Sequence, residues 1–346
     1  MKKKNLKNKQ QYFNSFDYLK VFFAISIVAW HTKALGPTSL VNSQLNLNLK
    51  EIIYGNLFLV AVPIFAQISL FLYIYNREIK KNYFWGRIFY LIILYLFWMA
   101  LLIILFYAGN RAKLQTLEFW LSGGASPLYF LLVLVVTTIV MEVFFLLKKL
   151  LNERIFISIS VLLLLISTLV LVFKVNLVNF MIPKYLPLLM SHWSPINFLP
   201  YVFSALLFFY LYQKNYFRNK NIQVMALITC FIIILIAYFE YRFIPNPIYL
   251  QYDGMIIPPY SRLSIILSTM LILYIFLNRE DRPSIIVKKM SELTLGIYIL
   301  HVFVMNLLAG FSSAYYQIIK NSVVYFGLVL LISLILTYLI KQKKII

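Results

Sequence analysis

The sequence predicts an all-α integral membrane protein with about ten transmembrane helices. Of its 346 residues, 62% are hydrophobic and only 12% are charged, whereas soluble domains carry about 25% charged residues. Apolar runs long enough to cross a hydrocarbon core of about 30 Å recur along the whole chain. Aromatic residues make up 18% of the sequence, as expected where aromatic belts flank many membrane spans.

Each of these apolar runs is expected to form one spanning helix. The first run is expected to be retained rather than cleaved as a leader, because no small-residue cleavage site follows it and further spans do. The runs cover residues 18–35, 52–75, 88–108, 127–147, 155–173, 196–212, 222–239, 263–277, 293–311 and 322–340.

The distribution of basic residues predicts the orientation of these helices. If the chain begins on the inner side, 23 of the 32 Lys and Arg residues fall in inner segments and nine in outer ones. Inner loops of membrane proteins are enriched in Lys and Arg, so both termini are expected in the cytoplasm. Topology thus accounts for most of the net charge of +21, and no binding to nucleic acid is expected.

Residues 1–346 are expected to form a single membrane-embedded domain, with basic cytoplasmic tails at residues 1–17 and 341–346. The only cysteine, Cys230, lies in an apolar run, so we expect no disulfide and no metal site. An extracytoplasmic molecule would be bound by the longer loops, which are all predicted outside. These loops are 36–51, 109–126, 174–195 and 241–261.

Lys20 and His31 are the first candidates for chemistry, because ionisable groups inside a spanning helix are costly and usually functional. They lie eleven positions apart, which places both on one face of a helix, about 16 Å apart along its axis. An imidazole titrates near neutral pH and accepts a proton from a hydroxyl group. The alternative is that His31 is structural and hydrogen-bonds a neighbouring helix.

A second histidine, His301, lies about 12 Å into the ninth run at the helical rise, and we expect it to face the same cavity as His31. Tyr298 lies three residues earlier, on the same helix face, and is its expected partner. Packing of His301 against a neighbouring helix is the alternative.

Charged residues near the inner surface form a third group of candidates. Arg87 ends a basic inner loop that also holds Lys80 and Lys81, and a guanidinium pairs with phosphate through two parallel hydrogen bonds. The alternative for all three residues is an anchor at the membrane surface. Glu142 lies in the fourth run, where a carboxylate must pair or be protonated. It is expected to pair with an inner cation or to orient a histidine.

Near the outer surface, Arg262 follows two prolines and is the residue expected to contact a ligand there. His192 and Trp193 in another outer loop offer a surface for stacking and hydrogen bonding.

Six stretches of the sequence occur in an order that resembles a known family. In the first, DYLKVFFAISIVAWH, ten positions separate Lys20 from His31. The others are VPIFAQISLFLY, WGRIFYLIILYLFW, SPLYFLLVLVV, SPINFLPYVFSALLFFYL and SELTLGIYILH. They resemble the first, second, third, fourth, sixth and ninth helices of the acyltransferase 3 family of integral-membrane acyltransferases.

The chain departs from the family pattern at two of these stretches. Leu70 replaces a glycine that is usual in the second helix. The third helix of the family normally begins with two arginines three apart, and here only the second is present, as Arg87, with Phe84 at the other position. Lys80 or Lys81 is the expected substitute for the missing arginine.

The resemblance implies an O-acyltransferase of a bacterial cell (inner) membrane that crosses the membrane several times. It would move an acyl group, usually acetyl from acetyl-CoA and sometimes succinyl, to a hydroxyl of a cell-surface or exported polysaccharide or glycolipid. His31 would act as general base or brief acyl carrier, Lys20 would guide the donor, and Arg87 with its neighbouring lysines would bind it. The expected partners are the lipid bilayer, acyl-CoA as co-substrate and a glycan or lipid-linked glycan acceptor, with no bound cofactor.

A polysaccharide exporter or flippase without acyl-transfer chemistry is the alternative, since it would share the same polytopic architecture. A transporter is expected to show inverted repeats or broken helices, and the sequence has no recognisable repeat. A membrane glycosyltransferase would need carboxylates in the outer loops, where only Glu118 and Asp253 are candidates.

Overall fold

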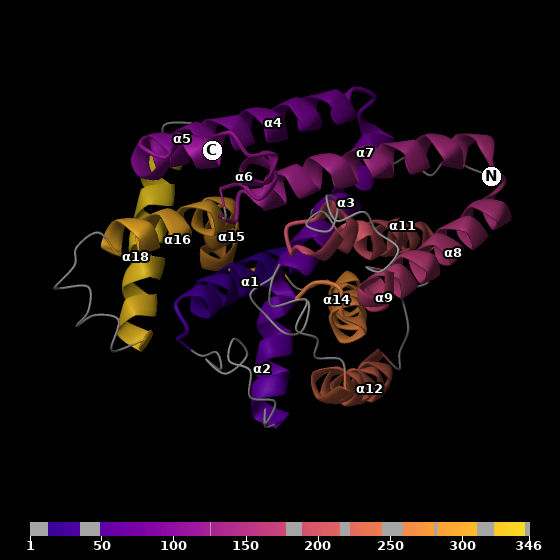
Figure 1. Ribbon diagram of the computed structural model, residues 1–346. Helices are drawn as coiled ribbons and strands as arrows, with labels where there is room; N and C mark the ends of the chain where they lie inside the picture. Colours follow the sequence, from indigo (N-terminus) through magenta and orange to yellow (C-terminus); the bar gives the residue numbers. More distant parts are fainter. Residues whose placement is uncertain are drawn as a thin grey trace.

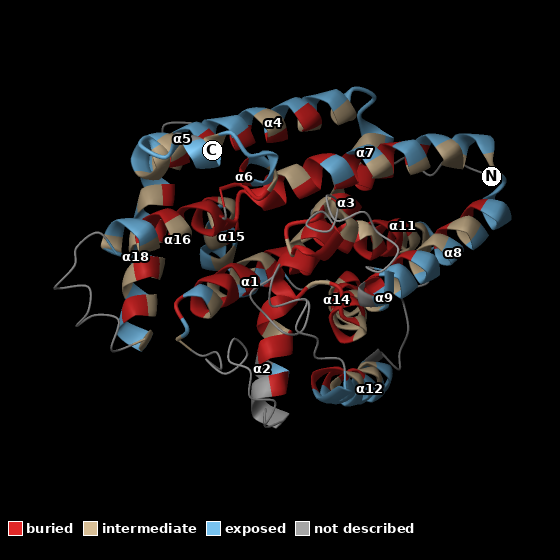
Figure 2. Ribbon diagram, viewed as in Figure 1, coloured by how far each residue is buried: buried red, intermediate tan, exposed pale blue. Residues whose placement is uncertain are grey.

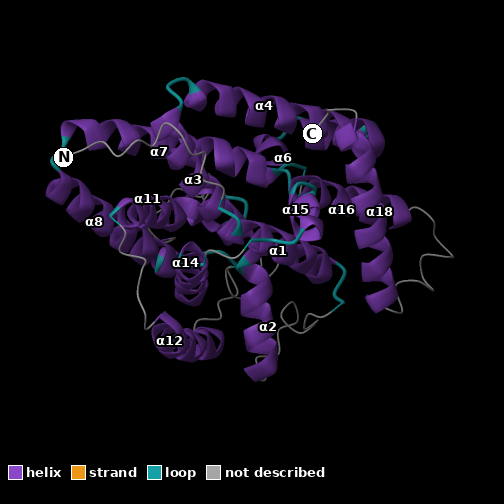
Figure 3. Cartoon of the chain, turned by 180° about the vertical axis from the view of Figure 1, so that it is seen from behind, coloured by secondary structure: helices purple, strands orange, loops and turns teal. Residues whose placement is uncertain are grey.

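The computed structural model describes residues 13–34, 49–124, 126–177, 189–214, 222–243, 259–279, 282–309 and 322–342. Over these residues the chain is helical and contains no strand, as Figures 1 and 3 show. Most of the predicted outer loop 241–261, which contains Asp253, and much of the predicted outer loops 36–51 and 174–195, lie outside the described residues.

Each apolar run of the sequence contains a helix. The long helices are α1 (Ser15–His31), α2 (Leu49–Leu59), α3 (Ala61–Ile79), α4 (Tyr83–Leu102), α7 (Tyr129–Leu150), α8 (Glu153–Val172), α11 (Leu199–Gln213), α12 (Ile222–Phe243), α14 (Leu263–Leu277), α16 (Thr294–Ala309) and α18 (Ser322–Gln342). The shorter elements are the π-helix η3 (Ile103–Tyr107), the 3-10 helix η6 (Pro195–Phe198), and the helices α5 (Arg111–Leu114), α6 (Leu117–Leu121), α9 (Lys174–Leu177) and α15 (Ile285–Ser291).

Seven segments of the described chain are helical, long and apolar enough to cross a membrane, or up to eight if a bent pair of helices counts as one span. The bent pair is α15 and α16, which meet at 58°. The helices α1 and α14 have 17 and 15 residues, short for a span of about 20 residues. The protein is therefore multi-pass, while the count of ten spans and the cytoplasmic position of the termini stay predictions.

The outer helices of the bundle expose apolar side chains, as expected where helices face lipid. Ile93 on α4 is 66% exposed and Leu227 on α12 is 72% exposed. Figure 2 shows exposed surface along α4, α8 and α12 and buried surface along the helices between them. The central helix is α3, most of whose residues are buried and which packs against α1, α7, α11 and α14.

A glycine turn places the start of α7. Gly123 and Gly124 adopt φ angles of +63° and +67°, a left-handed conformation that glycine adopts readily. A Cβ atom on Gly123 would lie 2.5 Å from the backbone nitrogen of Tyr129. The chain can therefore turn closely over the first residues of α7, which positions Pro127 and Tyr129 beside the centre of the bundle.

Candidate active site

A cavity of about 710 Å³ lies between α1, α3, α4, α7 and α16. Its polar lining includes Lys20, Lys80 and Arg87, three of the basic residues expected to bind a ligand. Its walls are apolar and its lining extends to Tyr298. The wall residues are Phe65, Ile68, Leu72, Leu91, Phe130, Leu131, Leu134 and Leu295.

Arg87 is held in this cavity by neutral groups from two neighbouring helices. Its Nη2 donates to Ser69 Oγ on α3 at 2.7 Å, and its Nε donates to Thr138 Oγ1 on α7 at 3.2 Å. Its Cζ atom lies 5.4 Å from the centre of the Tyr73 ring. Within the described residues no carboxylate forms an ion pair with Arg87. Its positive charge is therefore available to an anion in the cavity.

The lysines near Arg87 differ in their positions. Lys20 lines the cavity and lies 3.4 Å from Asp17 Oδ1, and the buried Asp17 also accepts a hydrogen bond from Ser291. Lys80 and Lys81 are both exposed, but only Lys80 lines the cavity. Of the two lysines expected to substitute for the arginine that Phe84 replaces, Lys80 is therefore the one in the cavity lining.

The rings of His31 and His301 contact each other at a tilt where α1 and α16 pack together. Their ring centroids are 5.1 Å apart, with the ring planes at 45°. His301 is fully buried, and its Nδ1 lies 3.1 Å from the carbonyl oxygen of Ile297. Since a carbonyl only accepts, Nδ1 carries the proton and Nε2 presents a lone pair. Nε2 forms no hydrogen bond in the described structure.

The histidine pair adjoins the cavity through Tyr298 instead of lining it directly. The rings of Tyr298 and His301 are 6.2 Å apart, while the Tyr298 hydroxyl donates to the carbonyl of Pro127 at 3.3 Å. The expected neighbour relation between Tyr298 and His301 is therefore a ring contact and not a hydrogen bond. His31 is exposed and is absent from the cavity lining, so Tyr298 stands between the cavity and the two imidazoles.

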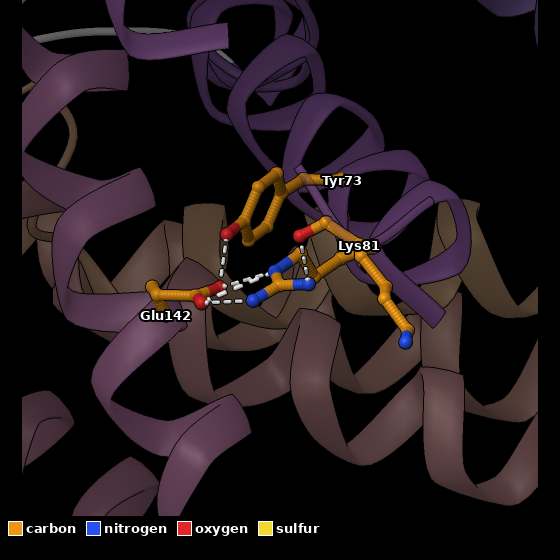
Figure 4. A network of polar contacts seen from close by, with 4 residues as sticks. Tyr73, Lys81 and Glu142 are labelled. Atoms are coloured by element: carbon orange, nitrogen blue, oxygen red, sulfur yellow. Dashed lines mark hydrogen bonds and ion pairs between the residues drawn. The ribbon is translucent and has the colours of Figure 1, made fainter. Parts of the chain in front are cut away.

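Glu142 pairs with a cation near the basic end of the cavity, and does not contact a histidine. Its partner is Arg77, with Nη2 at 2.8 Å from Oε1 and Nε at 3.1 Å from both carboxylate oxygens (Figure 4). Tyr73 donates a further hydrogen bond to Glu142. The sequence did not single out Arg77, because its only signal is a basic residue at the end of an apolar run.

The third histidine of the chain, His192, lies beside Tyr129 at the start of α7. Its ring lies 5.3 Å from that of Tyr129, edge to face at 86°. Asn197 Nδ2 donates to the carbonyls of Ser191 and His192 at 2.8 and 3.2 Å. The buried Lys174 amine lies 3.4 Å from Asn197 Oδ1. These contacts fix the described part of the loop between α9 and η6, which the sequence predicts on the outer side.

The side chain of Arg262 is buried and, among the described residues, its guanidinium has no hydrogen-bond partner. It is 3% exposed, and none of its three guanidinium nitrogens forms a hydrogen bond in the part of the chain that the structure describes. Its Cζ lies 4.5 Å from the centre of the Tyr241 ring. The nearby carboxylate of Glu240 instead accepts from the backbone nitrogens of Leu263 and Ser264 at 2.6 and 3.3 Å. Arg262 does not line the cavity described above.

The fold and the cavity define a helical, multi-pass membrane protein with a basic and apolar ligand site beside a pair of histidines. A family model described as an acyltransferase domain matches residues 13–342. The chain belongs to the acyltransferase 3 family and is a membrane acyltransferase. Neither the curated proteins nor the solved structures gave a match to this chain.

Proposed function

We propose that the protein transfers an acyl group from acyl-CoA, usually acetyl-CoA, to a hydroxyl of a cell-surface or exported polysaccharide or glycolipid at the inner membrane of a bacterium. Succinyl-CoA is the other donor that fits this role. The observation that carries the proposal is the cavity with Lys20, Lys80 and Arg87 in its lining and the histidine pair beyond Tyr298.

The cavity has the chemistry that an acyl-CoA requires. Its volume of about 710 Å³ lies in the range of about 300–1,000 Å³ that is typical of small-molecule sites. The apolar walls accept the pantetheine arm and the acyl group, and the three cations pair with the phosphates. The hydroxyls of Thr138 and Ser69 bond Arg87 Nε and Nη2 and so orient the guanidinium in the cavity that it lines.

In the proposed reaction His31 acts as general base. It takes the proton of the acceptor hydroxyl while the hydroxyl oxygen attacks the thioester carbonyl carbon. The carbon–sulfur bond then breaks, the CoA thiolate leaves and takes up the proton, and an ester remains on the acceptor. His31 is exposed and lies outside the cavity lining, which supports contact with the acceptor over a role as acyl carrier. His301 keeps the His31 ring in place through their contact.

The positive-inside distribution of Lys and Arg supports entry of the donor from the cytoplasm. The acceptor then approaches from the outer side, where Arg262 and His192 are the residues proposed to contact it. Arg262 supports this role because its buried guanidinium has unused donors.

The protein reconstituted in lipid nanodiscs tests the proposal with radiolabelled acetyl-CoA and lipid-linked glycans extracted from its own cells. We expect wild type to transfer label to the glycan in an alkali-labile ester. The His31→Ala variant should bind acetyl-CoA with unchanged affinity and transfer no label. A His31→Ala variant that transfers label at the wild-type rate would refute the role of His31.

An exporter or flippase without acyl-transfer chemistry is the second candidate, and the 58° bend between α15 and α16 favours it, since transporters use broken helices. It predicts that loss of the protein stops glycan export. The acyltransferase proposal predicts that the glycan is still exported and lacks its esters.

A further inference from the structure

Three polar side chains beside the donor cavity do not line it. They are Tyr73 and Arg77 on α3 and Glu142 on α7, and Figure 4 labels Tyr73 and Glu142. Glu142 and Tyr73 are buried, and the Glu142 carboxylate is bonded by both the Arg77 guanidinium and the Tyr73 hydroxyl. A carboxylate removed from water in this way is costly unless it is paired and hydrogen-bonded, so this arrangement fixes all three side chains.

This group is connected to both basic components of the donor site. Arg77 Nη1 donates to the carbonyl oxygen of Lys81 at 2.6 Å, which fixes the turn between α3 and α4. Lys80 lies in the same turn and lines the cavity. The Tyr73 ring, whose hydroxyl is bonded to Glu142, carries the guanidinium of Arg87 on its face at 5.4 Å.

Joining α3 to α7 does not by itself require Glu142. A second ion pair, Lys148–Glu78 at 2.8 Å, connects the same two helices closer to the surface. No hydrogen bond of Glu78 or Lys148 to the α3–α4 turn or to Tyr73 is found in the described residues. The Glu142–Arg77 pair is bonded to the α3–α4 turn and to Tyr73, whereas the Glu78–Lys148 pair only joins the two helices. Glu78 is therefore a matched control for Glu142.

We propose that Glu142 is a positioning residue for the acyl-CoA donor. Through Arg77 it holds the turn that carries Lys80, and through Tyr73 it holds the ring beneath Arg87, so that both cations are in place before the donor phosphates arrive. Groups that are already ordered lose less entropy on binding. This inference rests on the proposed function, because it assigns Lys80 and Arg87 to an acyl-CoA.

Steady-state kinetics in nanodiscs test the proposal with wild type and the variants Glu142→Gln, Tyr73→Phe, Arg77→Lys and Glu78→Gln. We expect Glu142→Gln to raise the KM for acetyl-CoA by about tenfold, with kcat and the acceptor KM within about twofold of wild type. Arg77→Lys should raise this KM by a smaller factor, because it keeps the charge of Glu142 paired and loses only the bond to Lys81. Glu78→Gln should match wild type.

A double-mutant cycle provides a readout that a purely structural role would not change. In a Lys80→Ala background, Glu142→Gln should raise the KM by a smaller factor than it does alone, because part of its effect acts through Lys80. Full additivity, a fall in kcat at constant KM, or equal behaviour of Glu142→Gln and Glu78→Gln would each overturn the proposal. If Glu142→Gln does not fold, Tyr73→Phe tests the positioning role in its place. This variant removes only a hydroxyl and should also raise the KM for acetyl-CoA, and an unchanged KM would overturn the proposal.

The experiments distinguish failure of the proposed function from failure of the positioning role of Glu142. If wild type and Glu78→Gln transfer no acyl group from acyl-CoA, the proposed function is wrong and this inference falls with it. If both transfer it and the KM of Glu142→Gln and Tyr73→Phe is unchanged, only the positioning role is wrong.

Discussion

The imidazole of His301 lies 5.1 Å from that of His31 and is fixed by a bond from its Nδ1 to the carbonyl of Ile297. The helices α1 and α16, from opposite ends of the chain, bring the two rings together. Because Nδ1 holds the ring in place, Nε2 is the nitrogen left for the interior of the site. This geometry predicts that the two nitrogens of His301 differ in importance.

Two substitutions of His301 test its Nδ1 and Nε2 atoms separately. An Asn amide reaches the position of Nδ1, whereas a Gln amide reaches that of Nε2. We expect His301→Asn to lower kcat by about 100-fold, the lower end of general acid–base contributions. His301→Gln, which keeps a polar group at the position of Nε2, should lower kcat by only about tenfold. The KM for acetyl-CoA should stay unchanged in both variants, because neither atom lines the cavity. Wild-type kcat in both variants would reduce His301 to a packing residue.

Lys80 and Lys81 form a second matched pair, because they are adjacent and only Lys80 lines the cavity. Loss of one charge-assisted contact to a donor phosphate should raise the KM for acetyl-CoA by about tenfold in Lys80→Ala. Lys81→Ala should leave the KM unchanged, since the bond from Arg77 uses only its backbone carbonyl. Titration of each variant with acetyl-CoA measures this difference, and equal KM values in the two would contradict the assignment of Lys80.

Gly86 lies in α4 at the cavity wall, and a Cβ atom there would meet nothing within 4 Å. Gly86→Leu should therefore fold normally, since replacing an exposed helical glycine favours the helix by up to about 1 kcal/mol. Its side chain should occupy cavity space beside Arg87, at the end proposed to bind the CoA phosphates, and lower kcat/KM by a similar factor for acetyl-CoA and succinyl-CoA. Gly327→Leu on α18, where the space around the glycine is also open, is the control and should match wild type with both donors. Wild-type kcat/KM with both donors in Gly86→Leu would show that the cavity does not hold the donor.

Arg262 offers a test in which stability and activity change in opposite directions. Replacement of a poorly paired buried charge by an apolar residue of similar length stabilises a fold by about 1 kcal/mol or more. We expect Arg262→Met to raise the unfolding temperature measured without substrate and to raise the acceptor KM by about tenfold. The KM for acetyl-CoA should not change, because Arg262 is outside the cavity. A higher unfolding temperature with an unchanged acceptor KM would contradict the proposed contact between Arg262 and the acceptor.

The sequence predicted the helices well, because each apolar run is long and ends at polar residues. The run 263–277 coincides with α14. The first run was extended to residue 35, but α1 ends at His31, because Thr32 caps the helix and Lys33 adopts a φ of +56°. The bend between α15 and α16 was missed, since the basic residues of α15 made it resemble an inner loop.

The candidate site was predicted in part. Helical spacing on α1 placed Lys20 and His31 on one face, and in the structure Lys20 lines the cavity while His31 does not. Contacts between distant helices have no local signal. The Arg77–Glu142 pair, 65 positions apart, and the position of Tyr298 between the cavity and the histidines follow from how the helices pack. Neither is readable from periodicity.

The central claim is that this membrane acyltransferase uses His31 to place esters on an exported glycan. The most direct test is the ester content, by NMR, of surface glycan from a deletion strain that expresses either wild type or His31→Ala. At equal amounts of protein in the membrane, the account predicts O-acyl signals with wild type and none with His31→Ala, from strains that export the same amount of glycan. Equal ester content in the two strains would contradict it.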